Sequence, residues 1–217
     1  MTKSTWAVII IVVLLLAVGA AVAYREPLSR LFSRPQAQAP VLESPGTGVQ
    51  TQQYATTTFA LQYPPEYALG EAYAYDQFGP KKLIHGISLA IPAAMVTAST
   101  SSPQAGTNLS AGTYLSVEQL PRAKKCTGDI FISADVKTQT VTEGGIDYSL
   151  ATTSGAAAGN RYEELVYALA TSSPCTAVRY YIHSTDIGNY PAGTVREFDR
   201  ITLIDAFDTI RRSVVMR

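Results

Sequence analysis

The sequence predicts an α+β domain in which an antiparallel sheet is covered by a C-terminal amphipathic helix. From Tyr54 onward, several stretches alternate apolar and polar residues, which is the period of a half-buried strand. One segment near the C-terminus instead repeats apolar residues at spacings of three and four, the period of an amphipathic helix. A charge-free apolar run and a linker precede both. We therefore expect a cytoplasmic tail at 1–5, a transmembrane segment at 6–24, a juxtamembrane segment and flexible linker at 25–53, and an extracytoplasmic domain at 54–217.

The run from Trp6 to Ala23 contains eighteen residues and no charge. A helix of this length spans about 27 Å, which is enough to cross the hydrocarbon core of a bilayer. Two alternatives stay open. The small-residue triplet that ends at Ala23 fits a signal-peptide cleavage site, and the three arginines that follow the run favour a cytoplasmic domain under the positive-inside rule. We expect a retained anchor, because the arginine-flanked apolar segment that follows suits the interface of an anionic membrane.

The linker and the net charge of the domain indicate where the domain lies and which classes of partner it can bind. Residues 35–53 hold no aromatic residue and a single charge, Glu43, so they bury too little surface to fold and are typical of a flexible spacer. From Tyr54 onward, 13 Lys and Arg residues stand against 15 Asp and Glu, a net charge of −2. No block of like charges is present, so the dense cationic footprint of a nucleic-acid-binding protein is missing. The expected partners are the membrane, through the N-terminal helix, and another envelope protein.

The two cysteines, Cys126 and Cys175, both follow the apolar run. An even count in an exported chain permits one disulfide, and closing a loop of about 50 residues stabilises by roughly 4 kcal/mol in the chain-entropy model. The alternative is two free buried thiols that pack as small apolar groups. Neither cysteine has the spacing of a zinc site, so we expect no metal ligand here.

Three strands are predicted in the first half of the domain. Apolar residues alternate from Phe59 to Tyr63, and the prolines that follow end the run. The stretch from Leu83 to Ile91 alternates likewise, with Leu83 on the same side as Ile87, and residues 112–120 are expected to pair with it. The low-complexity residues 97–112 between them predict a mobile loop.

A hairpin is predicted from Asn160 to Thr185, and its register can be specified. The expected register is Ala170 opposite Cys175, Tyr167 opposite Val178 and Leu165 opposite Tyr180. One face is then apolar, and a slip of one residue would expose it. The other face gathers Glu164, Val166, Arg179, Tyr181 and His183.

The final segment is predicted to be a helix. Thr194 and Glu197 have the spacing of a capping box. Apolar residues then recur at helical spacing, namely Val195, Phe198, Ile201, Ile204, Phe207, Ile210 and Val214. Arg211 and Arg212 suit the C-terminal end of the helix dipole. Three carboxylates, Asp199, Asp205 and Asp208, are expected to face solvent.

The stretches "TTTFALQYPPEY" and "FDRITLIDAFDTIRRSV" resemble the two edges of the Mog1/PsbP-like sandwich domains. In these domains an opening strand leads through proline to an aromatic residue, and a terminal helix covers an antiparallel sheet. This chain has Tyr67 where such domains often have tryptophan. The resemblance implies a sandwich fold and a binding or assembly role in a bacterial envelope-anchored protein, and it assigns no functional residue.

Candidate chemistry is sparse. His183 beside Glu164 could transfer a proton, because a neighbouring carboxylate can orient an imidazole. His85 and Ser88 are three apart in a strand and point to opposite faces. Three tyrosines, Tyr73, Tyr75 and Tyr190, are expected to be exposed and could form a binding surface.

The function expected is a membrane-anchored extracytoplasmic binding or scaffolding domain without catalysis, cofactor or metal. The alternative is an envelope hydrolase or transferase that uses His183 with Glu164.

Overall fold

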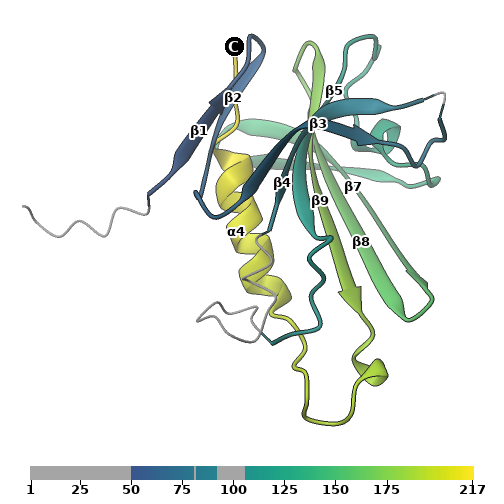
Figure 1. Ribbon diagram of the computed structural model, residues 1–217. Coiled ribbons are helices and arrows are strands. Elements are labelled where there is room, and N and C mark those ends of the chain that lie inside the picture. The colour runs from purple at the N-terminus through teal and green to yellow at the C-terminus, as the bar shows by residue number, and fades with distance from the viewer. Residues whose placement is uncertain (1–49, 81, 92–105) are drawn as a thin grey trace, which may run out of the picture. The chain divides into compact units, whose positions relative to one another are not determined.

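The computed structural model describes residues 50–80, 82–91 and 106–217 (Figure 1). The expected anchor at 6–24, the cleavage site after Ala23 and most of the linker lie outside these residues. Residues Val49–Arg217 form one compact unit. Among the described residues, no helix is long and apolar enough to cross a membrane.

The domain is mostly antiparallel sheet with one C-terminal helix, as the sequence predicted. Seven strands form the main sheet in the order β3-β4-β5-β9-β8-β7-β6, and three form a smaller sheet in the order β1-β2-β10. The strands of the main sheet are β3 (Ala68–Tyr75), β4 (Ile84–Ala90), β5 (Tyr114–Leu120), β6 (Thr138–Glu143), β7 (Ile146–Ala157), β8 (Asn160–Leu169) and β9 (Cys175–Thr185). Those of the smaller sheet are β1 (Gln52–Ala55), β2 (Phe59–Tyr63) and β10 (Val215–Met216), so that β1 includes the last two residues of the expected linker.

The predicted strands are present, with two local differences. The strand β2 has the predicted bounds, and β4 pairs with β5 as expected. Leu83, however, precedes β4 and is 41% exposed, because the buried side chain at this end of the strand is Ile84. The end of the expected mobile loop is also held in place: Leu109 is buried and bridges to Ser184 of β9. The prediction of a mobile loop, which was based on low sequence complexity, is therefore wrong for the part of the loop around Leu109.

The hairpin of β8 and β9 has the predicted register. Leu165 lies opposite Tyr180, and Tyr167 lies opposite Val178. Both pairs face the helix side of the sheet, where Tyr167 and Tyr180 pack against each other with ring centroids 5.2 Å apart. The alternation of apolar residues was sufficient to fix this register because a one-residue slip would bury the polar set instead.

The helix α4 (Arg200–Arg212) begins six residues later than the predicted cap. The side chain of Asp199 accepts a hydrogen bond from the backbone N–H of Thr202 and is the actual N-cap. Thr194 instead donates to the backbone carbonyl of Pro191 in a turn. The capping-box prediction was therefore wrong. Ile201, a member of the predicted apolar repeat, is 73% exposed in the first turn and does not belong to the buried stripe.

The main sheet separates two cores. On one face lies α4 (Figure 1). Its buried side chains Leu203, Phe207 and Ile210 share one core with residues of the strands. On the other face, the chain after β5 folds back over the sheet and forms the short helix η1 (Gly128–Phe131). The disulfide between Cys126 and Cys175 ties this covering segment to β9 and confirms the predicted bridge.

Candidate functional site

A buried arginine occupies the sheet face that η1 covers. Arg179 of β9 is 0% exposed, and its Nε lies 2.7 Å from Oε1 of Glu118. Its Nη2 donates to Oε2 of Glu118 at 2.9 Å and to the backbone carbonyl of Phe131 at 2.6 Å. Its Nη1 donates to Glu164. The guanidinium carbon lies 3.7 Å from the centroid of the Tyr75 ring. We call Arg179, Glu118 and Glu164 the Arg179 cluster.

The register of three neighbouring strands assembles the Arg179 cluster. Arg179 lies between Ser116 of β5 and Val166 of β8 in the pairing of β9. Glu118 lies two residues after Ser116 on β5, and Glu164 lies two residues before Val166 on β8, so both side chains project from the same face as Arg179. A carboxylate therefore approaches the guanidinium from each side. Strong, charge-assisted hydrogen bonds compensate the burial of these charges.

The pKa of Arg179 reflects its surroundings. Burial acts to lower the pKa, but the hydrogen bonds and negative charges of Glu118 and Glu164 outweigh it, and the pKa lies above the ordinary value. Burial also raises the pKa of Tyr75 to about 12. The arginine therefore stays charged and the tyrosine beside it stays neutral across the physiological range.

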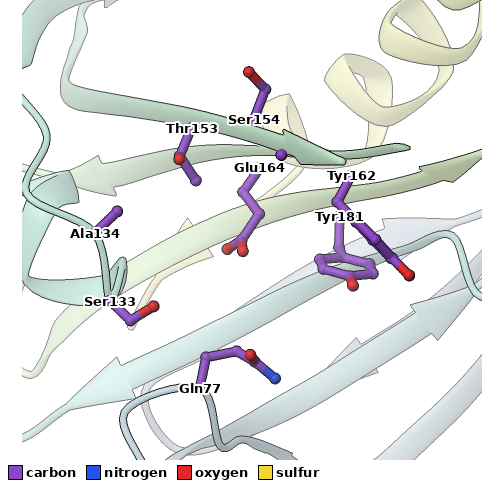
Figure 2. Close-up of a pocket in the computed structure, with 9 residues that line it drawn as sticks. Gln77, Ser133, Ala134, Thr153, Ser154, Tyr162, Glu164 and Tyr181 are labelled. Atoms are coloured by element: carbon purple, nitrogen blue, oxygen red, sulfur yellow. The ribbon is translucent and has the colours of Figure 1, made fainter. Parts of the chain in front are cut away.

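A pocket of about 420 Å³ opens beside the Arg179 cluster. Figure 2 shows the Glu164 carboxylate projecting into it, between Ser133 on one side and the rings of Tyr162 and Tyr181 on the other. Gln77 faces Glu164 from across the pocket. Only 13% of the Glu164 side chain is exposed, so the pocket has a single, partly desolvated carboxylate at its base.

A row of aromatic rings continues from the pocket across the sheet. The rings of Tyr114 and Tyr181 are stacked with centroids 4.9 Å apart, and those of Tyr162 and His183 are stacked at 4.7 Å. Tyr73 extends the row, with its ring 5.5 Å from that of Tyr114. Because neighbouring rings cover much of each other's faces, this row offers edges and hydroxyl groups to a ligand rather than a flat stacking platform.

The structure places His183 and Glu164 on one sheet face but does not join them. Nε2 of His183 lies 3.0 Å from Oδ1 of Asn160, and burial lowers the pKa of its imidazole. Glu164 is held by Arg179 and accepts a hydrogen bond from the Tyr75 hydroxyl. In the described part of the chain, no hydrogen bond or ion pair links His183 to Glu164. The register explains this result, because Glu164 lies opposite Tyr181 and next to Arg179.

The expected exposure is wrong for Tyr75 and Asp208, and Tyr73 and Tyr190 are half-buried. Tyr75 is only 4% exposed because it lies under the Arg179 guanidinium, and the Tyr73 hydroxyl donates to Glu118 at 3.0 Å. Tyr190 shares a hydrogen bond with the Thr185 hydroxyl. Asp208 does not face solvent either: 13% of its side chain is exposed, and it pairs with Arg211.

A separate groove is lined by four basic residues, three of which lie close together in the sequence. It has a volume of about 960 Å³, and apolar residues such as Leu120 and Ile130 line it. Its four basic residues are Lys82, Arg122, Lys124 and Lys125. Among the described residues, none of these four takes part in an ion pair. The fold thus makes one surface basic although the domain as a whole is slightly acidic.

Among the residues that the structure describes, no group of three or more His, Cys, Asp or Glu side chains is placed so that it could bind a metal ion. Sequence reasoning placed Arg179, Glu164 and Tyr181 on one face, but it missed Glu118. The alternation of "YLSVEQL" carries the relevant signal, since it puts Ser116 and Glu118 on the same face of β5.

Comparisons with known proteins add little to this geometry. No protein-family model and no curated protein matches the chain. One solved structure that matches is a protein from Bacteroides thetaiotaomicron VPI-5482, with 11% sequence identity and a TM-score of 0.42. The match covers 77% of this chain and 49% of that protein, so this chain spans about half of its length.

Proposed function

We propose that this chain is a membrane-anchored binding or scaffolding domain of the cell envelope, displayed outside the cytoplasm, which holds a ligand without transforming it. The observation that carries the proposal is the engagement of Glu164 by Arg179 at the base of the pocket. A general base must reach the proton that it removes. Here the carboxylate is already an acceptor for Arg179 and Tyr75.

The surroundings of His183 support binding over catalysis as well. Its ring is stacked on Tyr162 and hydrogen-bonded to the side chain of Asn160. Within the described residues, no serine, threonine or cysteine side chain is hydrogen-bonded to the imidazole as an activated nucleophile would be. The alternative, an envelope hydrolase or transferase using His183 with Glu164, would require both side chains to exchange their present partners.

The disulfide supports the proposed location. The bridge between Cys126 and Cys175 joins the segment that covers the Arg179 cluster to β9. Structural disulfides persist in oxidising compartments and are rare in the cytosol. An extracytoplasmic domain on a retained N-terminal anchor is therefore the arrangement that we propose, with the Mog1/PsbP-like sandwiches as its proposed fold family.

The location is tested by protease treatment of intact cells that express the full chain, followed by mass measurement under non-reducing conditions. We expect release of the domain with its disulfide intact, and an N-terminal fragment that remains with the membrane. A domain protected from protease in intact cells, with two alkylatable thiols, would contradict the proposed location.

The absence of catalysis is tested with His183→Gln. Under our proposal, any hydrolase or transferase activity measured on the purified chain is the same for the wild type and this variant. Turnover that is lost in His183→Gln, with the melting temperature retained, favours the enzyme alternative.

A further inference from the structure

The charges of the Arg179 cluster do not balance. One guanidinium faces two carboxylates, so the cluster carries a net charge of −1 when all three groups are ionised. The other carboxylates next to the pocket are compensated: Asp186 pairs with Arg161, and Glu163 pairs with Arg200. An excess charge in a mostly buried cluster is costly, so a further cation beside the cluster would be stabilising.

The spare acceptor lies on Glu164. Glu118 is saturated, since Oε1 accepts from Arg179, Ser116 and Tyr73 and Oε2 accepts from Arg179 again. On Glu164, Arg179 binds Oε2, and Oε1 accepts only a hydrogen bond of 3.3 Å from the Tyr75 hydroxyl. A carboxylate oxygen has room for a stronger donor, and the Glu164 carboxylate lies at the pocket (Figure 2).

The lining of the pocket suits a cation and not an anion. Around Glu164 the pocket presents neutral polar groups, including the side chains of Gln77, Ser133 and Thr153. Of the described residues that line it, none is basic. Hydroxyl and amide oxygens can accept hydrogen bonds from a ligand, whereas an anionic ligand would meet the Glu164 carboxylate without compensation.

The same domain already binds guanidinium groups between carboxylates and tyrosines. Arg179 lies on the Tyr75 ring between two glutamates. On the opposite face, Arg211 lies 4.2 Å from the Tyr167 ring centroid and pairs with Glu143 and Asp208. Both internal sites combine the planar fork of arginine with acidic and aromatic neighbours.

We infer that the pocket beside the Arg179 cluster binds an organic cation, a guanidinium or alkylammonium group, with Glu164 as its charge partner. This inference rests on the proposed binding function and names the ligand class of that site. The cation belongs either to a small molecule or to an arginine side chain of a partner protein, since both present the same group.

The test is calorimetric titration of the purified full chain in detergent with N-acetylarginine amide, which carries one guanidinium and no other charge. N-acetylcitrulline amide is the neutral isostere. We expect the citrulline compound to bind at least about ten-fold more weakly, because it lacks the charge-assisted hydrogen bond. Equal binding of the two compounds would overturn the inference.

Matched variants locate the binding. Glu164→Gln removes the charge at the pocket, and we expect affinity for N-acetylarginine amide to fall about ten-fold or more. Glu163→Gln removes the same charge from the neighbouring residue, which points to the other face and pairs with Arg200, and affinity should not change. An equal loss in both variants would indicate nonspecific surface attraction and would overturn the inference.

A steric variant keeps the test decisive if Glu164→Gln does not fold. Gly155 lines the pocket, and a Cβ built on it meets no atom within 4 Å. Gly155→Leu should therefore fill the pocket and abolish binding without altering charge, with an unchanged melting temperature. Retained affinity in a folded Gly155→Leu variant would place the ligand elsewhere and overturn the inference.

The source of the cation is distinguished with N-acetyl-Ala-Arg-Ala amide. Tighter binding of this tripeptide than of N-acetylarginine amide supports a partner protein, and equal or weaker binding supports a small molecule. No binding of any cation would overturn the inference but leave the proposed location and lack of turnover in place. Turnover that depends on His183 would overturn the proposed function whatever the cation result.

Discussion

Two arginines, Arg179 and Arg211, are fully buried on opposite faces of the same sheet. Each pairs with two carboxylates and lies against tyrosine rings. The difference is in the balance of charge. Arg212 also pairs with Glu143 and Asp208, so two cations face two anions around Arg211. Around Arg179, one cation faces two anions.

The two clusters also differ in their surroundings. Arg211 lies where α4 packs on the sheet, and its Nε donates to the Tyr180 hydroxyl while Tyr180 donates to Asp208. This balanced cluster joins the helix to the strands. The Arg179 cluster opens onto a pocket that contains Glu164. The difference in charge agrees with our proposal that the Arg211 cluster is structural and that the binding site lies at the Arg179 cluster.

The largest effect is expected for Arg179→Met. This substitution leaves Glu118, which is 0% exposed, and Glu164 next to each other without a cation. We expect the free energy of unfolding to fall by about 5 kcal/mol, measured by urea denaturation. The combined variant with Glu118→Gln and Glu164→Gln should recover a large part of the loss. A combined variant no more stable than Arg179→Met would show that packing, and not charge, dominates.

The double variant Cys126→Ser, Cys175→Ser releases the segment that covers the Arg179 cluster. The bridge closes a loop with a sequence separation of 49, and its loss should lower the free energy of unfolding by about 4 kcal/mol. The same variant should increase hydrogen exchange of η1 while α4 stays protected. Equal loss of protection on both faces would contradict the separation of the two cores.

Arg211→Met is expected to be less damaging than Arg179→Met. Arg212 already lies 3.3 Å from Glu143 and 3.4 Å from Asp208 and can compensate both. We expect a loss of about 3 kcal/mol in the free energy of unfolding, again from urea denaturation. Adding Arg212→Gln should enlarge the loss beyond the sum of the single effects. A larger loss for Arg211→Met than for Arg179→Met would reverse the comparison.

The smallest effect concerns pH and His183. Burial, beside Tyr162, Asn160 and Gly112, lowers the pKa of His183 below its ordinary value. The unfolded chain therefore takes up the proton first, and stability should fall as the pH drops from about 7 to 5. His183→Gln should flatten the stability profile in this window. The hydrogen bond from Arg211 lowers the pKa of Glu143, so this carboxylate should change the stability only at more acidic pH. A stability profile between pH 7 and 5 that is the same in His183→Gln and the wild type would therefore contradict the role given to His183.

The sequence was sufficient to predict those contacts that depend on the alternation of apolar and polar residues within a strand. The register of β8 and β9 followed from the period of two, which also placed Glu164, Arg179 and Tyr181 on one face. Glu164 was paired with His183 in the prediction, however, whereas its partners in the structure are Arg179 and Tyr75. The segment after β5 covers it, and a long-range arrangement of this kind leaves no local pattern.

The helix shows a different limit. The capping-box pattern at Thr194 competed with the aspartate cap at Asp199, and tertiary contacts selected the latter. Asn108 contributes to this choice, because its Oδ1 accepts a hydrogen bond from the backbone N–H of Phe198 just before the helix. Asn108 belongs to the segment predicted to be a mobile loop, so both errors have the same origin in contacts between distant parts of the chain.

The most direct measurement is an NMR titration of the full chain, labelled with ¹³C in its tyrosine rings, with N-acetylarginine amide. The rings of Tyr162 and Tyr181 line the pocket, whereas those of Tyr148 and Tyr167 lie beside Arg211 on the other face. Saturable shifts are expected for the first pair, with the second pair unchanged. Shifts that are equal on both faces, or absent from Tyr162 and Tyr181 at saturating ligand, would contradict a binding site at the unbalanced cluster.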